Sequence, residues 1–194
     1  DFLWKLDRKS GEQSIIYAFD KQDVSRVYRW PEFLPDEKTI LVSSSSAVAD
    51  SDSILLLYNQ ETGISKEIVS NAFNGRFVEQ TGHIVFVRGS SLWAVPFDLE
   101  QSNVSGNEVK LIDNIQTNGI LGSAAYSFSK NGRLVYLPGT DVAVASANLD
   151  INVVSRSGEV LEAIDITGRV GQLAISPDSS QLSYTAYESS ESDI

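Results

Sequence analysis

Cysteine and methionine are both absent from the 194-residue sequence, and histidine occurs only at His83. Without cysteine no disulfide bond can form, so the sequence does not indicate a redox compartment. One histidine without any cysteine cannot supply the clustered ligands of a zinc-type site. The sequence therefore predicts neither a metal ion nor a cofactor.

The motifs of several enzyme classes are also missing. No Gly-x-Ser-x-Gly elbow occurs, and no glycine-rich loop of the kind that cradles phosphate. His83 directly follows the turn glycine Gly82, which is typical of a partly exposed turn residue rather than a general base. We therefore expect no catalytic residue in this chain and no enzymatic activity of the chain alone.

Basic residues are in the minority, with 15 Lys and Arg against 26 Asp and Glu and a formal net charge of −11. This balance argues against nucleic acid and against anionic membrane surfaces as partners. No apolar run approaches the roughly 18 residues of a membrane span, and no signal peptide is recognisable. Hydrophobic residues make up 42% of the chain, enough to bury a core.

What the sequence does contain is a repeat. The stretch 29–42 predicts a strand, a tight Pro35-Asp36 turn and a second strand ending in Ile40-Leu41-Val42. Similar units return at 76–86, 126–136 and 173–184. A repeat of about 40–50 residues rich in short strands indicates the blades of a β-propeller. A helical repeat is the alternative, but no stretch keeps apolar residues at helical spacing.

Two sets of apolar anchors define the alignment of the repeats. The first-strand anchors are separated by 44, 51 and 47 residues, and the second-strand anchors by 44, 50 and 48. We expect all eight side chains to be buried: Phe33, Phe77, Phe128 and Ile175 on first strands, and Ile40, Ile84, Leu134 and Leu182 on second strands.

The predicted fold class is all-β, a single β-propeller over residues 1–194 built from four-stranded antiparallel blades. About four blade equivalents are expected, three complete and two complementary halves. The predicted ranges are 1–27 (half blade), 28–69, 74–115 and 124–166 (complete blades), and 171–194 (half blade).

These blades resemble the WD-repeat-like β-propeller of the TolB type. Leu34-Pro35-Asp36 and Ser176-Pro177-Asp178 match its Ser-Pro-Asp-Gly-type turn, whereas the turns ending at Gly82 and Gly132 depart from it. The stretches 29–36, 92–99 and 153–158 also resemble propeller segments found beyond bacterial serine/threonine kinase domains and in related multidomain regulators. The resemblance implies a binding or sensing module with no catalytic residues, and a periplasmic or extracytoplasmic location.

The mouth of the propeller is the predicted ligand site, because first strands line the central channel and their entry loops meet the second-to-third-strand loops. Its candidate residues are Arg29, Trp30, Arg76, Asp50, Asp52 and Asp141. An aromatic ring and two guanidinium groups could hold an acidic peptide or a carboxylated ligand. The alternative, which we favour on the sequence, is that Trp30 packs between blades while the arginines pair with these aspartates. A calcium site at Asp50 and Asp52 is a further alternative, less favoured than a solvated loop.

Both ends of the sequence read as cuts through a longer pattern, so we expect a fragment of a larger protein. Residues 1–27 supply the third and fourth strands of a blade, and residues 171–194 supply the first and second. The halves could close a four-bladed ring within one chain. They could also join two chains head to tail into an eight-bladed homodimer, the arrangement we favour.

Two functions remain open on the sequence. The first is a non-catalytic module that binds a protein or peptide ligand. The second is the propeller portion of a larger enzyme, such as a prolyl-oligopeptidase-like peptidase or a receptor kinase, whose catalytic domain is missing from this sequence.

Overall fold

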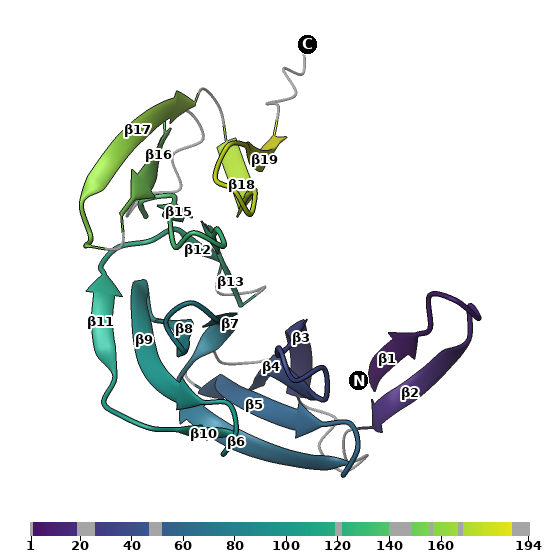
Figure 1. The fold of residues 1–194 in the computed structure, drawn as a ribbon. Coiled ribbons are helices and arrows are strands. Elements are labelled where there is room, and N and C mark those ends of the chain that lie inside the picture. The colour runs from purple at the N-terminus through teal and green to yellow at the C-terminus, as the bar shows by residue number, and fades with distance from the viewer. Residues whose placement is uncertain are drawn as a thin grey trace. The chain divides into compact units, whose positions relative to one another are not determined.

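The computed structural model describes residues 2–18, 26–46, 52–118, 122–139, 149–155, 157–166 and 169–187, and the statements below concern these ranges. Their regular structure consists of β-strands joined by turns, as the sequence predicts (Figure 1). Among them there is no helix long and apolar enough to cross a membrane.

The strands follow one another along the chain in nineteen short segments. They are β1 (Phe2–Leu6), β2 (Gln13–Ala18), β3 (Arg26–Phe33), β4 (Thr39–Ser46), β5 (Ile54–Asn59), β6 (Ile64–Ser70), β7 (Phe73–Val78), β8 (His83–Arg88), β9 (Ser91–Asp98), β10 (Asn103–Val104), β11 (Val109–Ile112), β12 (Thr117–Asn118), β13 (Ser123–Ala124), β14 (Tyr126–Phe128), β15 (Leu134–Tyr136), β16 (Leu149–Val154), β17 (Val160–Ile166), β18 (Arg169–Ile175) and β19 (Leu182–Tyr187).

Antiparallel meanders of four strands are the recurring unit. Two sheets have the order β3-β4-β5-β6 and β14-β15-β16-β17, and a third has the order β10-β9-β8-β7 with β11 also paired to β9. Three two-stranded sheets accompany them: β1-β2, β12-β13 and β18-β19. Neighbours in sequence are neighbours in the sheet, the arrangement of propeller blades. The predicted all-β class with four-stranded antiparallel sheets is confirmed.

The register of the strands confirms the predicted alignment of the repeats. In each of the four repeats the first-strand anchor lies directly opposite the second-strand anchor. The pairs are Phe33–Ile40, Phe77–Ile84, Phe128–Leu134 and Ile175–Leu182. Three of these anchor pairs are seven residues apart and follow a register shift on the first strand, whereas Phe128 and Leu134 are six residues apart and their paired segment has no shift. The anchors thus stay opposed in all four repeats although one turn is a residue shorter.

The prediction that all eight anchors are buried is only partly right. Ile40, Ile84 and Leu134 are buried, and each lies on the second strand of a meander, flanked by a strand on both sides. The first-strand anchors lie on edge strands. Phe77, Phe128 and Ile175 are half-buried, and Phe33 is 54% exposed, so its predicted burial was wrong. Leu182 is also half-buried, because β19 belongs to a two-stranded sheet.

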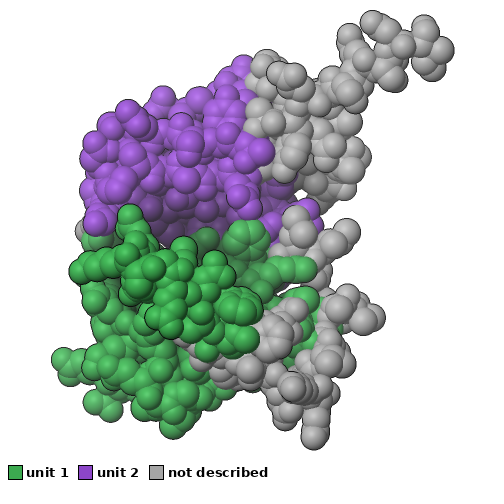
Figure 2. All heavy atoms as spheres, turned by 90° about the vertical axis from the view of Figure 1, so that its right-hand side faces the viewer, with its two compact units in different colours: residues 1–88, 93–109, 119–122 green, residues 89–92, 110–118, 123–194 purple. Residues whose placement is uncertain are grey.

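The chain divides into two compact units, coloured separately in Figure 2. Unit 1 comprises residues 1–88, 93–109 and 119–122, and unit 2 comprises residues 89–92, 110–118 and 123–194. Each has its own apolar core. The core of unit 1 includes Leu41, Leu55, Ile84 and Phe86, which come from two successive meanders. The core of unit 2 centres on Val135 and Ile151 and is extended by the half-buried Ile175 and Leu182.

A glycine lets β7 approach the preceding sheet within unit 1. A Cβ placed on Gly75 would lie 2.8 Å from one methyl of Leu55, 2.9 Å from the other and 3.4 Å from a methyl of Leu41. Any larger residue at 75 would force these core side chains to move. The close packing of β7 on β4 and β5 therefore depends on the missing side chain.

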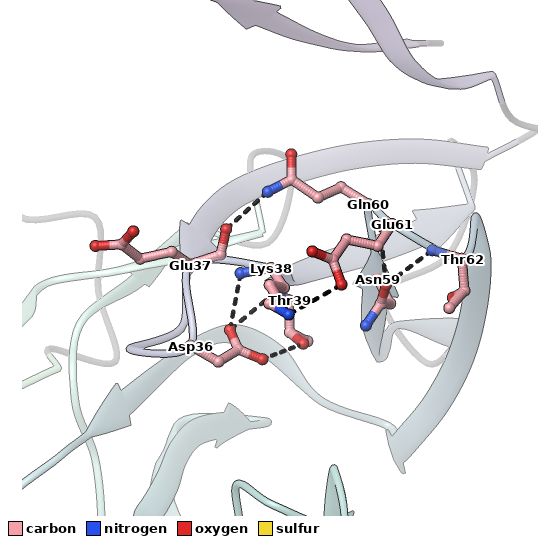
Figure 3. A network of polar contacts seen from close by, with 8 residues as sticks. All are labelled: Asp36, Glu37, Lys38, Thr39, Asn59, Gln60, Glu61 and Thr62. Carbon is pink, nitrogen blue, oxygen red and sulfur yellow. Dashed lines mark hydrogen bonds and ion pairs between the residues drawn. The ribbon is translucent and has the colours of Figure 1, made fainter.

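Polar side chains fix the turns of the first meander, and Figure 3 shows how two of these turns are joined. Asp36 accepts hydrogen bonds from the amides of Lys38 and Thr39 and from the Thr39 hydroxyl, at 3.1, 2.9 and 2.6 Å. Burial opposes ionisation, but these bonds outweigh it and lower the pKa of Asp36. Lys38 pairs with Glu61 of the β5–β6 turn at 3.1 Å.

The β1–β2 hairpin has the same turn as the β5–β6 hairpin. Asp7 accepts hydrogen bonds from the amides of residues 9 and 10, and Asn59 from those of residues 61 and 62. In both turns a glycine four residues later, Gly11 or Gly63, donates its amide to the carbonyl of the first residue and has a positive φ. The first hairpin thus carries the turn of a third-and-fourth-strand pair.

The β18–β19 hairpin instead carries a turn of the Asp36 kind. Asp178 accepts hydrogen bonds from the Ser176 hydroxyl at 2.6 Å and from the amide and hydroxyl of Ser180 at 3.0 and 2.9 Å. Led by the Ser176 bond, these contacts lower the pKa of Asp178 to about 2. The ionised turn therefore contributes stability above the ordinary aspartate pKa of 3.8, and this contribution is lost as the pH falls toward 2.

We expect the carboxyl carbon of Asp178 to titrate with a midpoint near 2 in an NMR pH series. The variant Ser176→Ala removes the strongest bond to the carboxylate, so its midpoint should move toward the ordinary value. A wild-type midpoint already at the ordinary value would show that the turn does not hold the carboxylate in this way.

Candidate ligand-binding site

A β-bulge in β3 sets the geometry of the predicted site. Arg29 is paired with Ser43 and Glu32 with Leu41, so three steps along β3 correspond to two along β4. Directly opposed residues share a face of a sheet, and Leu41 and Ser43, two apart on β4, share one as well. Arg29 and Glu32 therefore project from the same face, which a regular strand would not allow.

The bulge itself is formed by Trp30 and Pro31. Trp30 has φ of 59°, a left-handed conformation that costs a non-glycine residue about 1–2 kcal/mol. Its indole Nε1–H donates a 2.9 Å hydrogen bond to the carbonyl of Gly122. A Cβ placed on Gly122 would lie 4.0 Å from Nη1 of Arg29, so Arg29 and Trp30 reach the same glycine. This contact, made across 92 residues of sequence, holds the indole of the strained residue in place.

β7 has the same bulge as β3, and in both strands the bulge ends one residue before the anchor phenylalanine. Phe73 is paired with Val87 and Arg76 with Val85, with Asn74 at φ of 50° in the place that Trp30 occupies on β3. Arg76 consequently stands at the position of Glu32, one residue before the anchor phenylalanine. Nη1 of Arg76 donates to Oε2 of Glu32 at 3.3 Å, which joins the equivalent positions of two successive first strands.

The Glu32–Arg76 pair is half-buried and incompletely satisfied. The side chains are 27% and 40% exposed, respectively. Burial raises the pKa of Glu32, and the charge of Arg76, its hydrogen bond and the Phe77 amide oppose that rise without cancelling it. Within the described ranges, the bond to Glu32 is the one hydrogen bond that the five N–H groups of Arg76 make.

Among the predicted aspartates, Asp52 pairs with an arginine that is not a predicted site residue. Asp52, just before β5, is 58% exposed and pairs with Arg26, whose Nη1 lies 3.2 Å from its carboxylate. Arg26 also donates to the Ser44 hydroxyl at 2.9 Å and to the Asp52 carbonyl at 2.9 Å. Asp50 and Asp141 lie outside the described residues. Among the described residues no group of three or more histidine, cysteine, aspartate or glutamate side chains could hold a metal ion.

Two residues near Arg29 and Arg76 were not predicted. Glu32 could have been found from the spacing, because it precedes Arg76 by the same 44 residues that separate Phe33 from Phe77. Ser43, opposite Arg29, is only 6% exposed, and its hydroxyl has no hydrogen-bond partner among the described residues. Ser43 could not have been found from the sequence, because it is one of four consecutive serines at 43–46 and nothing distinguishes it from the others.

His83 behaves as the sequence predicts. It is the first residue of β8, half-buried, with Nδ1 2.6 Å from the carbonyl oxygen of Thr81 in the preceding turn. No nucleophile within the described ranges makes a hydrogen bond to it. The arrangement can bind charge through Arg29, Glu32 and Arg76, but it offers no general base beside a nucleophile.

No protein-family model matches the chain, and no curated protein matches it in sequence. Solved structures match its fold. A calcium-binding protein, regucalcin, from Agrobacterium tumefaciens has a TM-score of 0.67 at 15% identity, over 100% of this chain and 64% of that one. TolB from Acinetobacter baumannii has a TM-score of 0.64 at 15% identity, over 96% of this chain and 43% of that one.

An acylaminoacyl peptidase from Pyrococcus horikoshii is a third match, with a TM-score of 0.53 at 15% identity, over 78% of this chain and 26% of that one. The chain thus spans less than two thirds of the length of each of these structures. At such identities the likeness concerns the fold. Together with the repeated meanders and their common register, it shows that the chain has the fold of a TolB-like β-propeller.

Proposed function

We propose that this chain is a non-catalytic binding module whose first strands β3 and β7 hold an anionic ligand, either an acidic peptide or a carboxylated molecule. The observation that carries the proposal is Arg76. Its guanidinium is 40% exposed, and one of its five N–H groups has an acceptor among the described residues. A guanidinium with free donors and partial burial is suited to bind a carboxylate through two hydrogen bonds.

Two other arginines of unit 1 differ from Arg76 because each is bonded to several acceptors of the protein. Arg26 donates to Ser44 and to both the side chain and the backbone of Asp52. Arg88 donates to Glu108 and to the carbonyls of residues 70 and 71. Both guanidinium groups are occupied by acceptors of the protein itself, which supports a different role for Arg76.

Arg29 and Trp30 extend the proposed site along β3. The bulge turns Arg29 to the face that carries Glu32, and the indole of Trp30 is anchored at Gly122 beside it. A half-buried aromatic ring that shares Gly122 with the Arg29 guanidinium offers an apolar contact for the body of a peptide whose acidic groups face the arginines. The net charge of −11 gives no support for nucleic acid as the ligand.

The test is the affinity for a defined acidic peptide, N-acetylated tetraglutamate, measured by isothermal titration calorimetry. Arg76→Ala should weaken binding by about tenfold to a hundredfold, the range for hydrogen bonds to charged groups. Lys9→Ala removes an exposed positive charge from the β1–β2 turn and serves as the control. Equal losses in the two variants would mean that the peptide senses only overall charge, and the proposal would fail.

A second candidate function is the propeller portion of a larger enzyme. It is supported by the similarity of 78% of this chain to part of a peptidase chain. In that case catalysis would reside on another segment, with the propeller controlling access or binding the substrate. The sequence flanking this segment in the parent open reading frame decides between the two, because a hydrolase or kinase domain there would favour the second.

We further propose that the chain pairs with a second copy of itself. The β1–β2 hairpin has the turn of a third-and-fourth-strand pair, and β18–β19 has that of a first-and-second-strand pair. Trp4 and Ile15, directly opposed on the first hairpin, are 60% and 46% exposed. Edge pairing of β1 from one protomer with β19 from its partner would complete a four-stranded blade and satisfy both edges.

Light scattering at micromolar concentration should give a mass of about twice the 21.2 kDa of one chain. Deleting residues 1–19 removes the hairpin that completes the composite blade, so this variant should run as a monomer. A single-chain mass for the full sequence, or a dimer that survives the deletion, would contradict the pairing.

A further inference from the structure

We propose that Glu32 is a built-in competitor for the ligand site: its carboxylate occupies Arg76 in the free protein, and an external anion binds by displacing it. This inference rests on the proposed anion-binding function and adds its regulation. The relevant residues are Glu32 on β3, Arg76 on β7, and Arg29 and Ser43, which lie opposite one another on the β3–β4 pair.

The geometry places a carboxylate of the protein where a ligand carboxylate would bind. The bulges of β3 and β7 put Glu32 and Arg76 at equivalent positions of adjacent first strands, and they meet at 3.3 Å. The amide of Phe77 also supports the ionised form of Glu32. A guanidinium and a backbone amide converging on one carboxylate make up an anion site that is already filled.

The contact between Glu32 and Arg76 is weak enough for a ligand anion to replace Glu32. Arg76 touches Glu32 through a single nitrogen at 3.3 Å. Arg88, in contrast, uses two nitrogens on the two oxygens of Glu108, the second bond measuring 3.0 Å. Glu32 is also desolvated by its surroundings, which disfavours its charge and raises its pKa. A single long contact to a carboxylate that is costly to keep ionised can be displaced with little loss.

The buried hydroxyl of Ser43 is a second, independent indication of a ligand. It lies on the face of the sheet that carries Arg29 and Glu32, is 6% exposed, and lacks a hydrogen-bond partner in the described part of the chain. A buried hydroxyl without a partner is rare in folded proteins. An anionic group that displaces Glu32 would bring acceptor oxygens to this face.

The competition makes anion binding depend on pH in a definite direction. The charged groups facing Glu32 are Arg76 on β7 and Arg29 on its own strand, while β4 contributes the uncharged Leu41 and Ser43. Lowering the pH protonates Glu32, which releases Arg76. An anion that stays ionised, such as a sulfate, sulfonate or phosphate group, should therefore bind more tightly as the pH falls, whereas a ligand carboxylate would lose its own charge over the same range.

Sulfate is the probe, because it does not titrate in this range, and affinity is measured by calorimetry near neutral pH and at pH 4.5, where a pKa raised above the ordinary 4.5 leaves Glu32 mostly protonated. Wild type should bind more tightly at the lower pH. Glu32→Gln keeps the shape and removes the competitor, so it should bind more tightly at neutral pH. The gain is about fivefold if Glu32 occupies Arg76 in about four fifths of the molecules, because apparent affinity scales with the fraction of available sites. The affinity of Glu32→Gln should then change little with pH. Glu108→Gln neutralises another arginine-paired glutamate and should behave like wild type.

The possible results distinguish a failure of the Glu32 competition from a failure of anion binding itself. Sulfate binding that is equally strong in wild type and Glu32→Gln at both pH values would overturn the competition and leave anion binding at Arg76 standing. A pH dependence of the same size in Glu32→Gln would also overturn it, because Glu32 is the one titratable group that this variant lacks. No sulfate binding by any of the three proteins would overturn the competition, because a released Arg76 would then hold no non-titrating anion, whereas a failure to bind tetraglutamate would remove the proposed function itself. If Glu32→Gln does not fold, the wild-type pH series still tests the competition, because wild-type affinity that does not rise at the lower pH would overturn it.

Discussion

Replacing Ile84 with alanine is expected to lower the free energy of unfolding by about 2–5 kcal/mol, the usual cost of truncating a fully buried aliphatic side chain. Ile84 is 0% exposed on β8, an interior strand, and belongs to the apolar core that two successive meanders share in unit 1. The cavity would be enclosed by core side chains from both meanders, so little relaxation is available. Chemical denaturation followed by circular dichroism measures the loss.

Phe33→Ala is the matched comparison. Phe33 is a repeat anchor like Ile84, but it lies on the edge strand β3 and is 54% exposed. Its truncation should cost less than about 1 kcal/mol, closer to the effect of a surface change. If the two substitutions cost the same, or if Phe33→Ala cost more, the division between interior and edge anchors would be wrong.

Replacing Arg88 with alanine is expected to cost about 2–3 kcal/mol, since its bonds are charge-assisted but partly screened by solvent. Its Nε donates to the carbonyl of Asn71 at 3.2 Å and its Nη2 to that of Ser70 at 3.1 Å. Ser70 is the last residue of β6 and Asn71 follows it, so the two bonds hold the end of β6 and the start of the segment leading to β7. The guanidinium carbon also lies 5.2 Å from the ring of Phe86 and 5.3 Å from that of Trp93.

The variant Glu108→Gln separates the ion pair from the rest of this cluster. It keeps an acceptor for Arg88 and leaves the carbonyl and aromatic contacts intact, so we expect a loss of less than about 1 kcal/mol, as for exposed ion pairs. Thermal and chemical denaturation of both variants give the comparison. A loss for Glu108→Gln as large as that for Arg88→Ala would mean that the ion pair, and not the link to the β6–β7 segment, stabilises this region.

The strand order and the alignment of the repeats could be predicted from the sequence because they depend on local patterns. Proline, aspartate and glycine fix the turns, and apolar runs such as Ile40-Leu41-Val42 mark interior strands. The degree of burial could not be predicted as well. Phe33 and Phe77 share a repeat position, yet one is mostly exposed and the other packs against the core of unit 1. Burial depends on neighbours far away in sequence, which a repeat alignment does not contain.

The candidate site was predicted only in part, for a physical reason. Bulges decide which side chains share a face, and neither Trp30-Pro31 nor Asn74-Gly75 reveals a bulge to a pattern of alternating residues. Arg76 was expected to bind a ligand or an aspartate, but its partner is Glu32. Asp52 was placed with Arg29 and Arg76, but it pairs with Arg26. Asp50 and Asp141 fall outside the described residues and remain predictions.

The most direct test of anion binding at Arg76 is an NMR titration of the arginine-labelled protein with N-acetylated tetraglutamate, following the side-chain Nε–Hε signals. The Arg76 signal should shift and saturate, because its guanidinium retains free donors. Those of Arg26 and Arg88 should stay in place, since the protein already occupies them. An unchanged Arg76 signal at saturating peptide, or equal shifts in all three arginines, would contradict a specific site on β3 and β7.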